Sequence, residues 1–146
     1  MSETIGITSK LPADQRQALE RLLFFNVNQY RVRDGIRECI AMYGAPEIEE
    51  QDGALRVRVG DVSGVQSLFA VAASGRPIGV AVFVRLAFER FVVLHLGVES
   101  TYDARGGNAP VLLRLMHEIR SAARRTRGVE RIELVYKHFH SVHLHV

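Results

Sequence analysis

The chain has 146 residues, of which 47% are hydrophobic and 24% are charged, and this balance is typical of one globular domain over residues 1–146. Apolar runs stay well short of the ~20 residues that a membrane-spanning helix needs, and the first ten residues have no secretory signal core. The single cysteine, Cys39, excludes an internal disulfide, so we expect a reducing, cytoplasmic location.

Charge does not identify a partner. Nineteen basic and 16 acidic residues give a net charge of +3, which favours neither nucleic acid nor a membrane surface. A nucleic-acid-binding domain would need a basic stripe interleaved with aromatic residues, and the sequence has none. We therefore expect no nucleic-acid partner and no membrane partner.

The first third of the chain predicts a short edge strand followed by two helices. Residues 4–8 favour the strand, and hydrophobic periodicity favours helices over residues 12–28 and 32–42. Pro46 then begins a segment, residues 47–52, that is rich in acidic side chains and is interpreted as a turn.

The middle of the chain predicts four strands separated by short turns, over residues 55–59, 68–72, 78–86 and 91–98. Short turns are typical of antiparallel hairpins. The fourth strand is apolar on both faces apart from His95, so it is expected to be central and covered on both sides.

A long amphipathic helix over residues 109–126 precedes a fifth strand over residues 129–136. A strand–helix–strand crossover makes the fourth and fifth strands parallel. The predicted fold class is therefore α+β, with three α/β/α layers and a mixed, mostly antiparallel sheet whose parallel crossover covers residues 91–136.

The loop between the fourth strand and the long helix carries the clearest functional signal. Gly106 and Gly107 allow phosphate oxygens to approach the backbone, and Arg105 can add a bidentate contact. Asn108 suits the N-cap of a helix whose positive end faces the same loop. An anion-binding site and a plain glycine turn before a capped helix both fit this pattern.

These residues resemble the GCN5-related N-acetyltransferase (GNAT) family. The family's motif is a strand ending in Leu-x-Val, a loop with Arg/Gln-x-x-Gly-x-Gly/Ala, and a helix that opens with a Leu-Leu pair. Leu96 and Val98 match the strand end, residues 107–109 match Gly-x-Gly/Ala, and residues 112–113 are the leucine pair. The order of predicted elements resembles the family over residues 1–136.

The sequence departs from the family pattern at two places. Ala104 occupies the Arg/Gln position of the loop, with Arg105 one place later. Where the family continues with a helix and two strands, and commonly a tyrosine acid on that helix, only residues 137–146 follow the fifth strand. We expect a truncated fold, a fold completed by another chain, or a degenerate member.

The resemblance implies acetyl-CoA as co-substrate and an amine as acceptor. Main-chain groups of Leu96, Gly97 and Val98 would hold the pantetheine arm and polarise the thioester carbonyl. The loop would hold the phosphates of the coenzyme, through the residues Arg105, Gly106, Gly107, Asn108 and Ala109. The implied function is an acyl-CoA-dependent N-acyltransferase in which the amine attacks the thioester directly.

Four residues are candidates for proton transfer. His95 has an ordinary pKa near 6.5 and suits a general base, although a histidine on a central strand is also typical of a core residue. Glu99 shares the strand face of His95 and is a second base, and Glu133 on the fifth strand is a third option. Tyr136 is the candidate acid, with a packing role as the alternative.

The last ten residues hold four of the six histidines. His143 and His145 would share one face of a terminal strand, and we expect a polar strand face there rather than a metal site. The strand is predicted to pair with the fifth strand of this chain or with a neighbour's edge, giving a homodimer. The alternative to an enzyme is a non-catalytic acetyltransferase-like module that binds coenzyme A or a protein partner.

Overall fold

The structure, a computed structural model, describes residues 4–24, 33–99, 111–134 and 142–145. Its main sheet has six strands in the order β1-β5-β6-β7-β8-β9. Their bounds are β1 Gly6–Thr8, β5 Gln66–Val71, β6 Pro77–Ala87, β7 Arg90–Val98, β8 Arg131–Leu134 and β9 Val142–His145. Every neighbouring pair is antiparallel except β7 and β8, which are parallel.

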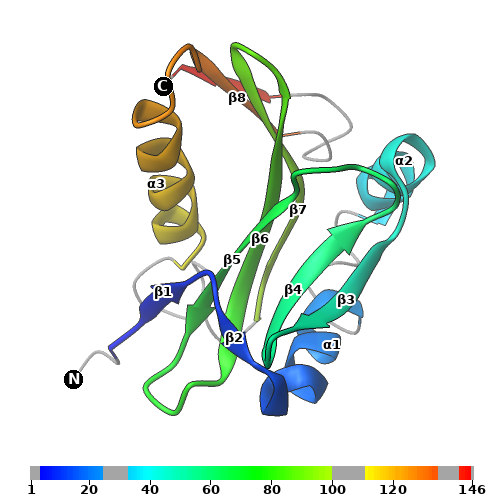
Figure 1. The fold of residues 1–146 in the computed structure, drawn as a ribbon, viewed down its shortest axis with the longest axis vertical. Coiled ribbons are helices and arrows are strands. Elements are labelled where there is room, and N and C mark those ends of the chain that lie inside the picture. The colour runs from blue at the N-terminus through cyan, green and yellow to red at the C-terminus, as the bar shows by residue number, and fades with distance from the viewer. Residues whose placement is uncertain (1–3, 25–32, 100–110, 135–141, 146) are drawn as a thin grey trace.

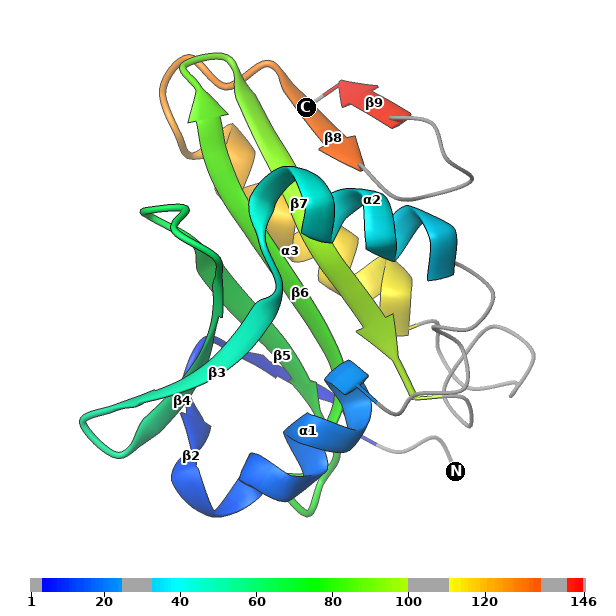
Figure 2. The ribbon, with the colours of Figure 1, turned by 90° about the vertical axis from the view of Figure 1, so that its right-hand side faces the viewer.

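In the described residues three α-helices cover the two faces of this sheet, and Figure 1 shows how they are divided between the faces. Helix α3 (Val111–Arg124) lies on one face, and helices α1 (Arg16–Phe24) and α2 (Arg33–Tyr43) lie on the other. The predicted α+β class, the mixed sheet and the parallel crossover through α3 are all confirmed. Figure 2 shows α2 crossing in front of β7, with α3 behind the sheet.

The acidic segment after α2 is a strand, so the predicted turn over residues 47–52 is wrong. Strand β3 (Pro46–Gln51) pairs with β4 (Ala54–Val59), and β4 pairs with the short β2 (Leu11–Pro12) in a separate three-stranded sheet. The turn is confined to Asp52 and Gly53, whose φ angles of 54° and 80° are those of a tight two-residue hairpin. The acidic side chains of β3 are explained by its exposed face.

Charged pairs on that exposed face match β3 to β4. Glu47 is opposite Arg58 and Glu49 is opposite Arg56, and both pairs form salt bridges. Opposite charges directly across an antiparallel pair favour this register. The acidic residues therefore belong to the charged face of a strand, not to a turn.

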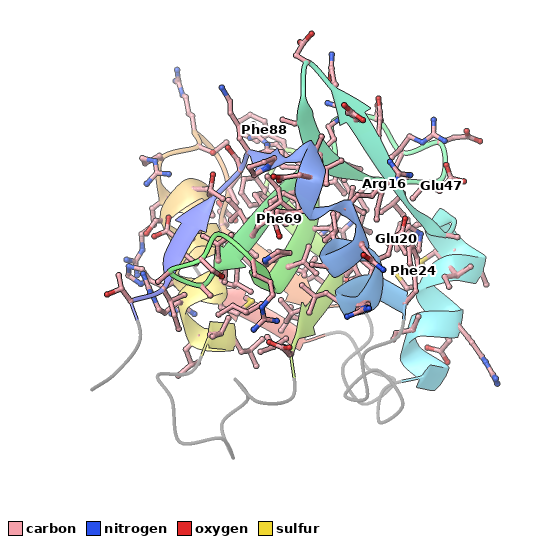
Figure 3. The ribbon with its side chains drawn as sticks, turned by 90° about the horizontal axis from the view of Figure 1, so that it is seen from below. Arg16, Glu20, Phe24, Glu47, Phe69 and Phe88 are labelled. Atoms are coloured by element: carbon pink, nitrogen blue, oxygen red, sulfur yellow. The ribbon has the colours of Figure 1, made fainter. Side chains whose placement is uncertain are left out.

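The other predicted elements are confirmed, with bounds that differ from the expected ones by a few residues in either direction. The first strand is β1, at the edge of the sheet as expected. The first helix begins as the 3-10 helix η1 (Ala13–Gln15) and continues as α1, on whose outer side Arg16 and Glu20 form an exposed ion pair (Figure 3). Residues 25–28, 32, 109–110 and 135–136, at the ends of four predicted elements, lie outside the described residues.

The sheet separates two apolar cores. On the α3 side the core combines helix residues such as Leu115 and Ile119 with Phe83 and Val93 of the sheet. On the α1–α2 side it combines α1, α2 and β4 with the opposite faces of β5, β6 and β7, and it includes the fully buried Phe69 (Figure 3). Strand β7 is thus central and covered on both faces, as its composition predicted.

Candidate functional site

The central strand β7 contains a β-bulge. In its pairing with β6, His95 is opposite Val82 and Val93 is opposite Phe83. Within β6 and β7, both described throughout, Leu94 is the one residue of β7 that has no partner in this register. An extra residue of this kind locally disrupts the ladder and bends the strand.

The bulge changes which residues face which side of the sheet. Before it, Val93 packs in the core beside α3 and Val92 in the core beside α1 and α2. After it, Val98 packs beside α3, whereas a Cβ on Gly97 would lie 3.6 Å from the Leu22 carbonyl oxygen of α1. A strand without the insertion would have placed odd-numbered residues on the α3 side throughout. The bulge therefore turns His95 and Gly97 toward α1 and α2.

His95 is enclosed on that side. Its Nε2 atom lies 3.8 Å from the position of a Cβ on Gly97, and the side chain is only 4% exposed. Burial lowers the pKa of His95 to about 4, because a charged imidazolium would lose its hydration. The imidazole is therefore neutral at physiological pH, able to accept a proton but weak as a base.

Helix α2 contacts the bulge directly. The Cys39 thiol donates a buried hydrogen bond of 3.0 Å to the Leu94 carbonyl oxygen. Beside this contact is a hollow of about 10 Å³, enough for about one water molecule. Its lining is mostly apolar and comprises Ile36, Cys39, Ile40, Gly44, Pro46, Val59, Leu94 and His95.

Glu99 follows the last residue of β7. Its backbone N–H donates to the Ile78 carbonyl at 2.9 Å, which continues the pairing with β6. Its Oε1 accepts a hydrogen bond of 2.8 Å from Arg76, and its Oε2 is buried with no hydrogen-bond partner among the described residues. The carboxylate is therefore held by Arg76 directly after the last residue of β7.

A second cluster of polar side chains joins β7 to β8 near Tyr43, the last residue of α2. Arg90 of β7 donates to Glu133 of β8 at 3.0 Å, and the Glu133 side chain is only 12% exposed. Burial raises the pKa of Tyr43, at the end of α2, the negative charge of Glu133 raises it further, and the positive charge of Arg90 lowers it. The sequence analysis missed Tyr43, because nothing local relates the end of α2 to β8.

The first turn of α3 lies unusually close to the sheet. A Cβ on Gly79 of β6 would lie 2.8 Å from Val111 Cγ1 and 3.1 Å from Leu115 Cδ1. Arg114 also donates a hydrogen bond to the Ile5 carbonyl, just before β1. Glycine at position 79 thus allows the start of α3 to approach the end of β7, since Gly79 pairs with Val98.

Several predicted site residues lie outside the described residues. These are Arg105, Gly106, Gly107, Asn108, Ala109 and Tyr136. Those described are His95, Leu96, Gly97 and Val98, which are consecutive on β7, and Glu99, which follows them. The roles predicted for all of these residues stay predictions.

The terminal strand pairs within the chain, which is the first of the two pairings predicted for it. Strand β9 is antiparallel to β8, with His143 opposite Glu133 and His145 opposite Arg131.

The described residues contain no group of three or more metal-ligating side chains. Among them, likewise, no helix is long and apolar enough to cross a membrane.

Comparison with solved structures identifies the fold. An IAA acetyltransferase from Bacillus cereus ATCC 14579 superposes with a TM-score of 0.51 at 15% identity, covering 90% of this chain and 65% of that one. A GNAT-family acetyltransferase from Staphylococcus aureus Mu50 gives a TM-score of 0.55 at 12% identity, covering 90% and 73%. The chain has the GNAT fold.

The likeness is one of structure only. A glucosamine N-acetyltransferase region of a fungal multi-domain β-N-acetylglucosaminidase also superposes, with a TM-score of 0.50 at 12% identity, and covers 94% of this chain. No family model matches the chain, and the search of curated proteins gave no significant match. The chain spans about two-thirds of the length of the Bacillus cereus protein. The GNAT fold thus places β7, β8 and α3 in a known framework.

Proposed function

We propose that the chain is an acyl-CoA-dependent N-acyltransferase, which transfers an acetyl group from acetyl-CoA to an amine by direct attack on the thioester. The observation that carries this proposal is the bulge at Leu94, within a GNAT fold. It turns a neutral imidazole toward the α1–α2 side of β7, directly before the Leu96–Val98 backbone that would hold the pantetheine arm.

The coenzyme would bind where β7 ends and α3 begins. Main-chain groups of Leu96, Gly97 and Val98 would accept and donate hydrogen bonds to the pantetheine arm, and would polarise the thioester carbonyl. The phosphates would lie at the start of α3, held by Arg105, Gly106, Gly107, Asn108 and Ala109. The close packing of Gly79 against Val111 supports this placement, because it brings that helix start near the end of β7.

His95 would accept a proton during the transfer. A base with a pKa of about 4 is too weak to deprotonate a free alkylammonium ion efficiently. The amine would therefore enter neutral, having lost its ammonium proton to solvent, and would attack through its free lone pair. The nitrogen becomes far more acidic once it has bonded to the thioester carbon, and we assign this second proton to His95. Glu99, directly after β7, would be a second base. Tyr136 would protonate the leaving thiolate of coenzyme A.

Binding of acetyl-CoA is the first test. Calorimetry on the purified chain should show micromolar affinity, and Gly107→Val should abolish it, because a side chain there blocks phosphate approach. Gly6→Ala is the control for a glycine substitution elsewhere, since a Cβ at Gly6 meets only Val71 Cγ2, at an ordinary 3.5 Å. Equal affinity in the Gly107 variant and the native chain would refute the loop assignment.

A non-catalytic module that binds coenzyme A or a protein partner is the second candidate. It is favoured by the burial of His95 and by the ion pair that engages Glu99 with Arg76. The two candidates differ in turnover: His95→Ala should reduce acetyl transfer to an amine panel while leaving acetyl-CoA affinity intact. Binding without transfer to any amine would favour the module.

We also propose that the chain forms a homodimer through β9, the last strand of the six-stranded sheet. Exposed strand edges are ready templates for pairing with another chain. Sedimentation equilibrium should give twice the 16.4 kDa chain mass. Leu144→Pro should reduce the measured mass to that of the monomer. A monomer in the native chain would refute this proposal.

A further inference from the structure

The bulge residue Leu94 has an unusual hydrogen-bond environment. It has no register partner on β6, and the β7–β8 ladder described here ends one residue earlier, at Val93 and Leu134. Its carbonyl oxygen instead accepts a hydrogen bond from the Cys39 thiol, 55 residues away on α2. A buried carbonyl without a partner costs about 1–3 kcal/mol, so this contact has an energetic consequence.

Side-chain packing beside the bulge leaves a small hollow. The hollow beside the thiol is bordered by Leu94 and His95 on one side and by Ile36 and Ile40 on the other. A gap at this point leaves fewer side-chain contacts to oppose a slip of the strand. The thiol contact is thus a direct polar link between α2 and the residue at which β7 changes face.

We propose that Cys39 is a positioning residue, whose thiol holds the Leu94 carbonyl and so keeps His95 and Gly97 on the α1–α2 face of β7. This role rests on the proposed function, since it matters for transfer only if the end of β7 binds acetyl-CoA. Cys39 itself touches neither substrate, and it acts through the backbone of Leu94.

The chemistry of the group suits a permanent donor. Cys39 is 4% exposed, and burial raises its pKa to about 11. The sulfur therefore keeps its proton, and its ability to donate, across the physiological pH range. A cysteine that served only as a small apolar filler would be replaceable by valine without consequence for β7.

The hydrogen bond can be observed directly, without any activity. Because the chain has one cysteine, the infrared S–H stretching band reports on Cys39 alone. We expect this band at lower frequency in the folded protein than in the urea-unfolded protein, as for a donating thiol. A band at the same frequency in both states would overturn the proposal.

Two substitutions separate donation from packing. Cys39→Val removes the donor at similar volume, and Cys39→Ser keeps a donor. We expect Cys39→Val to weaken acetyl-CoA binding roughly tenfold and to shift the His95 ring resonances, whereas Cys39→Ser stays close to the native chain. Equal affinity in Cys39→Val and the native chain, or equal losses in both variants, would overturn the proposal.

The control is Val57→Ala, which lies in the same core on β4 but does not line the hollow beside the bulge. It should lower stability without changing acetyl-CoA affinity. If Val57→Ala weakened binding as much as Cys39→Val, the effect would come from general loosening of the core. A lowered S–H frequency in a native chain that binds no acetyl-CoA would refute the proposed function and leave the thiol contact established.

Discussion

The two faces of the six-stranded sheet are built differently. Among the described residues, the buried side chains of the core beside α3 are apolar, and its helix is placed by the close approach of Val111 to Gly79. The core beside α1 and α2 includes the buried Cys39 and His95, a bulge and a small hollow. The first face has the features of a stable support, and the second has every buried group on which the proposed chemistry depends.

This difference predicts which substitutions change stability alone and which also change protonation and hydrogen bonding. The buried side chains described in the α3 core are apolar, so their substitution should change stability and little else. On the α1–α2 face the same volume change also disturbs protonation and hydrogen bonding. The predictions below test that division, beginning with the largest expected effect.

Ile119→Ala should be the most destabilising of the changes considered. Ile119 is fully buried on α3, and removing its side chain leaves a cavity that costs about 2–5 kcal/mol. Urea denaturation measures this loss. Leu113→Ala on the same helix is the control, since Leu113 is 63% exposed and should change stability by less than about 0.5 kcal/mol. Similar losses in both would contradict the described packing of α3.

The pH dependence of stability should reveal His95 on the other face. Its pKa is about 4 when folded and 6.5 as the ordinary value, so between these pH values only the unfolded chain binds the proton. Stability should therefore fall as pH drops from 6.5 to 4, by roughly 3 kcal/mol from this group. His95→Leu should remove that part of the slope.

Urea titrations of the native chain and of His95→Leu at several pH values measure this difference. Carboxylates that titrate in the same range contribute equally to both proteins and cancel. His117→Gln is the control, because His117 is exposed on α3. A slope that is the same in the native chain and in His95→Leu would show that His95 is not buried as described.

The sequence predicted the framework and not the bulge. Periodicity indicated the three helices and most strands, and the apolar run of residues 91–98 correctly indicated a strand covered on both faces. That same run hides the bulge, because a strand buried on both faces has no alternation for an extra residue to interrupt. The contact of Cys39 with Leu94 is equally invisible, since it joins residues 55 positions apart.

Acidic composition misled in one place and long-range pairing in another. Glu47 and Glu49 were interpreted as turn residues, whereas their partners Arg58 and Arg56 lie on the next strand. Tyr43 was overlooked because Glu133, which raises its pKa, is ninety positions away in sequence. Local patterns therefore predicted the helices and strands. The contacts between polar groups depend on how elements far apart in the sequence pair, which local patterns do not show.

Gly79→Ala tests the close approach on the α3 face. Its Cβ would lie 2.8 Å from Val111, so we expect a loss of about 1–3 kcal/mol as the helix start moves outward. Gly6→Ala is the matched control in a neighbouring part of the sheet, where the new Cβ meets Val71 at 3.5 Å. Thermal denaturation of both variants is the measurement, and a Gly79→Ala protein as stable as Gly6→Ala would contradict the packing.

The smallest effect should come from the ion pairs outside both cores. Arg56 and Glu49 are half exposed and 3.4 Å apart on the three-stranded sheet, so their coupling should be about 0.2–1 kcal/mol and should fade in high salt. Arg90 and Glu133, 3.0 Å apart and more buried under α2, should couple more strongly and resist salt. Double-mutant cycles at low and high salt measure both couplings. Equal coupling would mean that the pair under α2 is as hydrated as the surface pair, and the α1–α2 face would lose the low-dielectric character that depresses the pKa of His95.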